Sequence, residues 1–504
     1  MHSFDYLLVH APRYMRIAAS SHGITQTIHL TPGPMATVPM LQTSDLSVER
    51  GSRAVLKGVD FELSSGEIVA LVGDNGSGKT TMLEACAGIL PLSGGSIKRH
   101  SKSGKMQVVR DYEGRRCQPP PTGLTLQRDG ICGEETVEER LEVALKVAGM
   151  EMSEPTASDV LREWGLEHRR ADRISQLSGG QRRRLAVLCG IAPAALCAEP
   201  RVVMLDEPSE GLDRAGKELL IGWLRGLMLN GHAAIVATHD QAVIDCSDRI
   251  MEITNGTLNE SNGTSEGIPS DLPNPLPSTE QSTHGALIRW AIKMETRNPM
   301  DTIGRAAPAL VALLLSYALI GEIDTTYVGN DLVAALVLTP AFITAVISPA
   351  LTRRLAEERC GAWWNAMIGP SARQTYSFLG TSIILPLPIT YLAWVVLIDP
   401  ADFAHHSEIT RWLWLPAVIM IDIAAAAAAL HLLVADLRRA SAATASLLLL
   451  VLVWPFLQLT DALSLMMTDG MSFGLNLGDP LISCLIASLI SAAVWAVAVF
   501  LPDA

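Results

Sequence analysis

The chain has 504 residues, of which 49% are hydrophobic and 18% are charged, and its formal net charge is -13. A chain of this length exceeds what one hydrophobic core serves, so two or three domains are expected. The negative charge argues against nucleic acid as a partner, because binding phosphates along a duplex requires a basic surface. The eight cysteines include no C-x-x-C pair, and we interpret them as thiols in a reducing compartment rather than as metal ligands or disulfides.

Composition divides the chain into four regions. Residues 1–37 form an irregular N-terminal extension without the apolar core of a signal peptide, and either Met35 or Met40 could be the true start. Residues 38–257 alternate short aliphatic runs with helical stretches, which predicts an α/β domain. Residues 258–284 are rich in Pro, Ser, Asn and Gly and are expected to be a solvated linker.

Residues 285–504 are predicted to be an all-α transmembrane domain of six helices. The region opens with a basic amphipathic stretch around Trp290, which is typical of a helix lying in the membrane interface. Apolar runs long enough for a hydrocarbon core, about 20 residues each, then recur six times. They cover residues 306–323, 332–351, 378–398, 413–434, 443–466 and 481–501.

Positive charge alternates between the loops that join these runs. The loops that we place inside carry Arg353, Arg354, Arg359, Arg373, Arg438 and Arg439, whereas two of the opposite loops contain no Lys or Arg. The positive-inside rule then predicts a multi-pass protein of the cytoplasmic membrane, with the α/β domain and both termini in the cytoplasm.

The clearest chemical motif is a glycine loop between a predicted strand and a predicted helix. The segment GEIVALVGDNGSGKTTMLEACAG contains the pattern G-x-x-x-x-G-K-T, whose backbone N–H groups cradle the phosphates of ATP while the lysine reaches the β- and γ-phosphates. The hydroxyl of Thr80 is expected to ligate Mg²⁺. The predicted nucleotide contacts are Gly73, Asp74, Asn75, Gly76, Ser77, Gly78, Lys79, Thr80 and Thr81.

Two carboxylates follow a second aliphatic strand, RVVMLDEP. A buried parallel strand delivers them to the carboxyl edge of the sheet, where open α/β sheets bind their ligands. We expect Asp206 to hold Mg²⁺ and Glu207 to act as the general base on the attacking water. A solvated acidic pair is the structural alternative, and the apolar lead-in and Pro208 disfavour it.

Between these motifs stands LSGGQRRRLAVL, from Leu177 to Leu188, which resembles the signature of ABC transporter ATPases. The resemblance implies an α/β P-loop ABC ATPase domain and a homodimer, in which the signature of one copy faces ATP bound by the other. It assigns nucleotide-contacting roles to Ser178, Gly179, Gly180, Gln181 and Asp213, a γ-phosphate contact to His239, and nucleotide and Mg²⁺ contacts to Gln127, for which Gln118 is the alternative.

One position departs from the pattern of the family. ABC ATPases usually carry an aromatic residue that stacks on adenine before the glycine loop, and this chain has Arg50 in SVERGSRAVL near that place. A guanidinium also stacks on a base. Arg50 is therefore either the adenine-stacking residue or an ordinary surface arginine.

The membrane region resembles the ABC-2 group, and within it the membrane subunit of the cytochrome c maturation haem exporter. The resemblance is carried by the length of the region, by Arg297-Asn298-Pro299, by PALTRRLAEERCGAWWNAMIGPSARQ and by LLVLVWPFLQLTDAL. It implies ATP-driven export or release in haem delivery, with haem-handling membrane proteins and the lipid bilayer as partners. An ABC-2 exporter of a drug, lipid or polysaccharide is the alternative, and mechanical work on membrane partners is a third.

Three polar residues in the membrane region are candidates for functional roles, and the sequence does not decide between these roles and structural ones. Asp422 lies in the middle of an apolar run, where a charge normally marks a functional site or bonds to a neighbouring helix. His405 and His406 are adjacent in a predicted exterior loop, either as haem-iron ligands or as a solvated surface pair.

Overall fold

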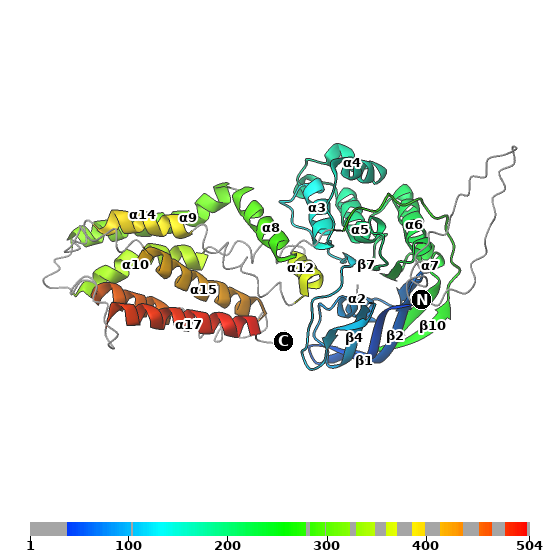
Figure 1. The fold of residues 1–504 in the computed structure, drawn as a ribbon, viewed down its shortest axis with the longest axis horizontal. Coiled ribbons are helices and arrows are strands. Elements are labelled where there is room, and N and C mark those ends of the chain that lie inside the picture. The colour runs from blue at the N-terminus through cyan, green and yellow to red at the C-terminus, as the bar shows by residue number, and fades with distance from the viewer. Residues whose placement is uncertain are drawn as a thin grey trace, which may run out of the picture. The chain divides into compact units, whose positions relative to one another are not determined.

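The computed structural model describes residues 38–101, 104–278, 283–297, 299–322, 329–347, 359–369, 386–398, 414–436, 453–465 and 479–500 (Figure 1). The chain divides into two compact units. The first is Met1–Gln281 with Ala366–Gly369, and the second is Ser282–Asn365 with Pro370–Ala504. The predicted N-terminal extension and the histidines His405 and His406 lie outside the described residues.

A six-stranded sheet forms the centre of the first unit, with the order β10-β9-β3-β8-β7-β6. All neighbours are parallel except β10, which pairs antiparallel with β9. Strands β7 and β8 are buried along their whole length, which is why they read as unbroken apolar runs rather than as alternating ones. The strands are β3 (Ile68–Val72), β6 (Gly123–Thr125), β7 (Val202–Asp206), β8 (Ala233–Ala237), β9 (Arg249–Thr254) and β10 (Thr257–Asn262).

A second, antiparallel sheet of four strands has the order β2-β1-β4-β5. The hairpin of its first two strands closes where Arg50 pairs with Arg53. Burial alternates along much of β1 and β2, as expected for a sheet with one face toward a core. The strands are β1 (Pro39–Arg50), β2 (Arg53–Ser64), β4 (Gly94–His100) and β5 (Met106–Asp111).

Several helices of the first unit begin at polar residues that cap them. Thr136 and Glu139 form a reciprocal capping box at the start of α3, and the Asp213 carboxylate accepts a hydrogen bond from the Gly216 N–H at the start of α6. Such caps satisfy N–H groups that have no partner inside the helix. The helices are α2 (Lys79–Cys86), α3 (Val137–Val147), α4 (Glu154–Glu163), α5 (Gly179–Ala195), α6 (Arg214–Leu229) and α7 (Gln241–Asp245), with short 3₁₀ turns at Glu167–Arg169 and Ile174–Gln176.

Residues 263–278, which we name the strap, cross α6 after β10 ends. The Ser270 N–H donates to the Gly222 carbonyl at 2.9 Å, and the Leu276 N–H donates to the Leu196 carbonyl at 2.8 Å. A Cβ atom at Gly226 would lie 2.5 Å from the Ser270 carbonyl oxygen, so α6 needs glycine where the strap approaches it. Much of the sequence that we expected to be linker is thus β10 and strap.

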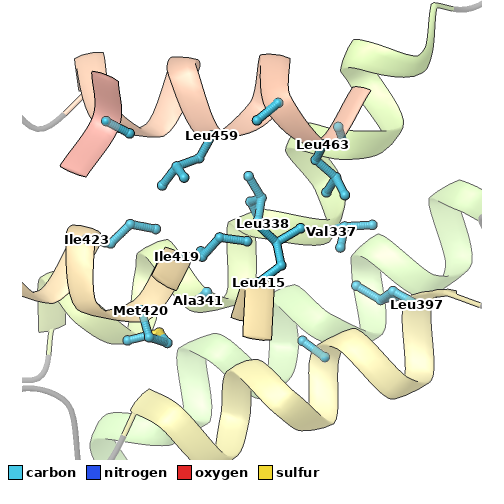
Figure 2. Close-up of a cluster of buried hydrophobic side chains, with 14 of the residues drawn as sticks. Val337, Leu338, Ala341, Leu397, Leu415, Ile419, Met420, Ile423, Leu459 and Leu463 are labelled. Atoms are coloured by element: carbon cyan, nitrogen blue, oxygen red, sulfur yellow. The ribbon is translucent and has the colours of Figure 1, made fainter. Parts of the chain in front are cut away.

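The second unit is helical in the part of the chain that the structure describes. An apolar core joins α9, α10, α14, α15, residues 453–465 and α17, and Figure 2 shows Leu338, Ile419 and Leu459 meeting in it. Over these described ranges, no helix combines the length and the apolar character needed to cross a bilayer. The helices are α8 (Thr283–Arg297), α9 (Pro299–Glu322), α10 (Asn330–Ile347), α12 (Cys360–Ile368, ending in the first unit), α14 (Pro386–Ile398), α15 (Trp414–Asp436) and α17 (Pro480–Phe500).

Two polar or aromatic features stand out within this unit. Trp290 of α8 lies against Trp364 of α12, with their ring centroids 5.4 Å apart. Asp422 of α15 is buried and accepts a hydrogen bond from the Ser488 hydroxyl of α17 at 2.9 Å. Of the two expectations for Asp422, the bond to a neighbouring helix is therefore present.

Candidate active site

The phosphate loop connects the carboxyl end of β3 to the first residue of α2. Gly78 has φ 119°, and a Cβ atom there would lie 2.9 Å from Val55 Cγ1, so glycine is required at this position. The Lys79 ammonium donates to the carbonyl oxygens of Gly73 at 2.8 Å and Asp74 at 3.3 Å. The loop and the lysine thus lie together at the N-terminus of α2, a position that favours the binding of a phosphate group.

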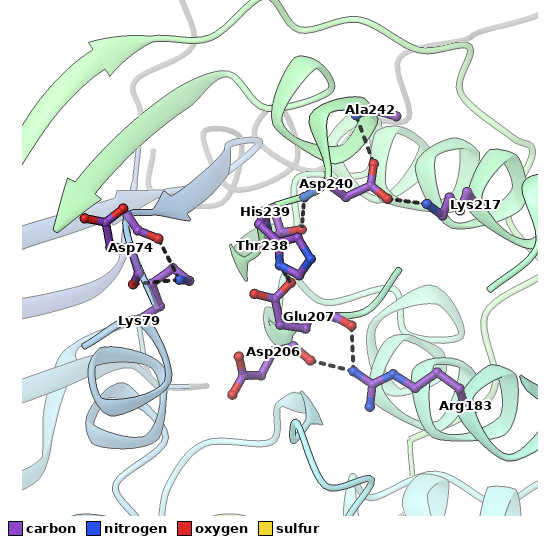
Figure 3. A network of polar contacts seen from close by, with 11 residues as sticks. Asp74, Lys79, Arg183, Asp206, Glu207, Lys217, Thr238, His239, Asp240 and Ala242 are labelled. Carbon is purple, nitrogen blue, oxygen red and sulfur yellow. Dashed lines mark hydrogen bonds and ion pairs between the residues drawn. The ribbon is translucent and has the colours of Figure 1, made fainter. Parts of the chain in front are cut away.

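Asp206 ends β7 close to this loop (Figure 3). It is 1% exposed, and neither of its carboxylate oxygens has a hydrogen-bond partner. Burial raises the pKa of Asp206 to about 6, and the neighbouring Thr80 hydroxyl opposes the rise. Buried, unsatisfied carboxylate oxygens beside a hydroxyl are a suitable donor set for Mg²⁺, which prefers oxygen ligands and takes few of them from protein. The residues present therefore fit the predicted metal.

Glu207 and His239, which are far apart in the sequence, meet directly. His239 Nδ1 lies 2.9 Å from Glu207 Oε2, and the His239 backbone N–H donates to the same oxygen at 3.3 Å. Glu207 is largely buried, whereas the imidazole is mostly exposed. The Glu207 backbone has φ 48°, a region that non-glycine residues seldom adopt and that often marks a functional site.

Gln127 follows β6 at the same edge of the sheet. Since β6 pairs in parallel with β7 up to Thr125 and Leu205, Gln127 emerges beside the strand that carries Asp206. Gln118 precedes β6 and so lies at the amino end of that strand. Of the two glutamines that the sequence offered, the position of Gln127 fits a site at the carboxyl edge.

The signature residues have local structural roles in a single copy of the chain. The Ser178 hydroxyl accepts from the Gln181 N–H, and the Gln181 side-chain oxygen accepts from the Ser178 N–H, which makes a capping box at the start of α5. Asp213 caps α6 and forms an ion pair with Arg184 at 2.5 Å, and that pair lowers the pKa of Asp213. The predicted contacts to a nucleotide on a second copy stay a prediction.

Arg50 is held against the helix that follows the phosphate loop. Its guanidinium forms an ion pair with Glu84 of α2, and the two side chains are 44% and 0% exposed. Arg50 is thus neither a free surface arginine nor far from the loop. Whether its exposed face stacks on adenine stays a prediction.

Sequence reasoning missed Arg183, the second arginine of the triplet in QRRRLAVL. Its guanidinium is buried and bonds to main-chain oxygens at the ends of both β6 and β7, including those of Asp206 and Glu207 in Figure 3. The only sequence signal was its place in the signature helix, and a run of arginines looks like a solvated face.

A phosphate loop leading into a helix, with an Asp–Glu pair at the end of a nearby parallel strand, defines the class of P-loop ATPases. The family model described as ABC transporter matches residues 56–210. The lipoprotein-releasing system ATP-binding protein LolD of Bacteroides thetaiotaomicron is 31% identical over 231 residues, which are 44% of this chain and 99% of that protein.

The macrolide export ATP-binding/permease protein MacB of Hyphomonas neptunium is 28% identical over 287 residues, which are 55% of this chain and 43% of that protein. A solved structure described as a dimeric, post-hydrolysis ATP-binding cassette bound to ADP and Pi is 24% identical, covers 45% of this chain and all of that one, and has a TM-score of 0.37.

The chain belongs to the ABC transporter family of ATP-binding proteins, and its first unit is an ABC ATPase. The matched region spans 40–43% of the length of several other relatives, MacB of Hyphomonas neptunium among them. The two relatives named above act, by their descriptions, in lipoprotein release and in macrolide export.

Proposed function

We propose that the chain is one half of a homodimeric machine that hydrolyses ATP to drive work at a membrane. The observation that carries the proposal is the convergence of Lys79, Asp206, Glu207 and His239 at the carboxyl ends of β3, β7 and β8. Ligands of open α/β sheets bind at this edge.

Hydrolysis follows from the arrangement of these side chains. The phosphate loop and Lys79 would bind the β- and γ-phosphates. Glu207 would accept a proton from a water molecule. At the same time the oxygen of that water would bond to the γ-phosphorus, and the bond between the γ-phosphorus and the oxygen that leaves with ADP would break. His239, bonded to Glu207 Oε2, would orient that carboxylate and contact the γ-phosphate. Mg²⁺, held by Thr80, Asp206 and Gln127, would supply positive charge to the phosphates.

A second copy of the chain would complete each ATP site. Ser178, Gly179 and Asp213 are exposed at the surface of the first unit, where a partner is able to reach them. The start of α5 offers main-chain N–H groups and a positive dipole end to an approaching γ-phosphate. Two copies would then enclose two nucleotides between opposed phosphate loops and signatures.

The helical unit would contact the bilayer. Its helices expose large aliphatic side chains on the face opposite their core: Leu314, Leu315 and Leu319 on α9, and Leu485 and Leu489 on α17. Helices that are apolar on all sides belong in a protein core or in lipid. Together with the six apolar runs of the sequence, this supports a multi-pass location in the cytoplasmic membrane with the ATPase in the cytoplasm.

Haem for cytochrome c maturation is the cargo that the sequence of the membrane region favours, because that region resembles the membrane subunit of the cytochrome c maturation haem exporter. Export of another compound is the competing reading. Purification of the full chain in detergent, followed by mass spectrometry of what copurifies, separates them. Copurified haem-handling membrane proteins would support the first, whereas ATPase stimulation by drugs or lipids in their absence would exclude it.

The assignment of the base is tested with Glu207→Gln in the full chain. We expect ATP turnover to fall about 100-fold or more while ATP binding persists, with ATP trapping a dimer that light scattering detects. Glu210→Gln is the matched control, because Glu210 lies three residues further on and is exposed. Wild-type turnover in Glu207→Gln would show that another group is the base.

A further inference from the structure

The second arginine of the signature helix is buried although its neighbours are not. Arg183 is 6% exposed, and its guanidinium points from α5 into the space between the ends of β6 and β7. A buried guanidinium is costly to desolvate unless its donors are satisfied by well-placed acceptors. The contacts of Arg183 therefore show what it is placed there to hold.

The two terminal nitrogens of the guanidinium serve two different chain segments, while the buried Nε has no hydrogen-bond partner. Nη1 donates to the Leu126 carbonyl at 3.0 Å, to the Gln127 carbonyl at 3.5 Å and to Asp129 Oδ1 at 2.8 Å. Nη2 donates to the Asp206 carbonyl at 2.6 Å and to the Glu207 carbonyl at 2.7 Å. One planar group thus joins the segment after β6 to the segment after β7.

The position of this bridge matters because the sheet ends just before it. The last paired residues of the two strands are Thr125 and Leu205, so the next residues on each strand have no ladder between them. Arg183 supplies the connection beyond the ladder. A lysine in its place would offer one nitrogen where the guanidinium offers two in a fixed plane.

The bridge also bears on the backbone of Glu207. Its φ of 48° is an unfavourable conformation for a glutamate, which persists only where the surrounding structure holds it. Three hydrogen bonds reach its main chain: the Glu207 N–H donates to the Ala237 carbonyl at 2.8 Å, and the Glu207 carbonyl accepts from the Glu210 N–H at 3.1 Å and from Arg183 at 2.7 Å. Removal of the guanidinium leaves the bonds to Ala237 and Glu210 but removes the one that ties the Glu207 backbone to the segment after β6.

We propose that Arg183 is a positioning residue that fixes the Gln127 segment and the Glu207 backbone at one spacing, so that the carboxylate of Glu207 is aimed at the attacking water. The inference rests on the proposed role of Glu207 as the base. The contacts of Arg183 are to main-chain oxygens and to Asp129, so it would act through Glu207 rather than on the nucleotide directly. Its loss should therefore reduce turnover and leave nucleotide binding, which depends on the phosphate loop, largely intact.

The test uses full-length Arg183→Gln and Arg183→Lys. Arg162→Gln is the control for loss of an exposed arginine, since Arg162 pairs with the exposed Asp159 and Glu167. A misplacement of about 1 Å costs about 100-fold in rate, so kcat of Arg183→Gln should fall by about that factor while KM changes less than about threefold. Arg183→Lys should recover only part of the loss. Wild-type kcat in Arg183→Lys would overturn the inference.

A double-mutant cycle separates this inference from the proposed function. In the Glu207→Gln background, Arg183→Gln should lower the residual turnover by less than about threefold, because the group it positions is gone. An equal, independent loss in both backgrounds would overturn the inference and leave the base assignment standing. Wild-type turnover in Glu207→Gln alone would overturn both. If Arg183→Gln lacks a thermal unfolding transition, the same cycle is run with Arg183→Lys.

Discussion

His232 makes the stability of the ATPase unit depend on pH. It is 1% exposed at the start of β8, and its Nδ1 accepts a hydrogen bond from the Arg201 N–H at 3.0 Å. Burial, assisted by the charge of Arg201, lowers the pKa of His232 from 6.5 to about 4. The folded unit thus keeps the imidazole neutral at a pH where the unfolded chain protonates it.

The sign and size of the effect follow from these two pKa values. Since the folded pKa is the lower one, the unfolded state binds the proton first, and stability is lost as pH falls through 6.5 toward 4. Between pH 7.5 and pH 5.5 the loss is about 1.4 kcal/mol. For a unit of this size that corresponds to a decrease in Tm of about 3–6 °C.

The measurement is calorimetry of the full chain at both pH values, compared with His232→Asn. The asparagine side-chain oxygen is able to accept the Arg201 N–H, and the residue does not titrate. The variant should therefore lose about 1.4 kcal/mol less than the wild type over this interval. Equal pH dependence in the two proteins would refute the account, whatever their absolute stabilities.

Two further predictions concern Arg50, which stands where the family usually has an aromatic residue, and Gly226, a glycine inside a helix. Arg50→Tyr, which places an aromatic side chain beside α2, should tighten ATP binding about threefold to tenfold in a binding titration, because a base stacks on an aromatic ring; an unchanged Kd would place residue 50 away from the base. Gly226→Ala should lower the stability of the unit by about 1–3 kcal/mol through its clash with the Ser270 carbonyl, despite the better helix propensity of alanine. Glu218→Ala, on an exposed part of α6, is the control, and equal Tm values for the two variants would contradict the clash.

The phosphate loop and the Asp–Glu strand could be predicted because local chemistry determines them. Gly78 has a positive φ that glycine adopts readily, so the residue type itself indicates the turn. The apolar run before Asp206 indicates a strand that is buried on both faces. The family of the ATPase followed from LSGGQ for the same reason. These signals lie within a few residues of the structure that they specify.

The remaining features depend on partners distant in sequence. Glu84 gives no sign that it meets Arg50, which is 34 residues earlier. The sequence around Arg183 predicts a charged, solvated helix face. In the structure its guanidinium instead bonds to the ends of β6 and β7. The composition of residues 263–278 predicts a solvated segment. Its place is set by Gly222 and Gly226 of α6, which precede its first residue by 37 residues or more, and by its bonds to Gly222 and Leu196.

The strap also determines where the ATPase can be divided from the rest of the chain. A cut after Asn262, where the last strand ends, would remove the main-chain bonds from Ser270 and Leu276 and uncover the glycine surface of α6. That surface would then be exposed to other chains. A separately produced ATPase that retains its native solubility should therefore continue through residue 278.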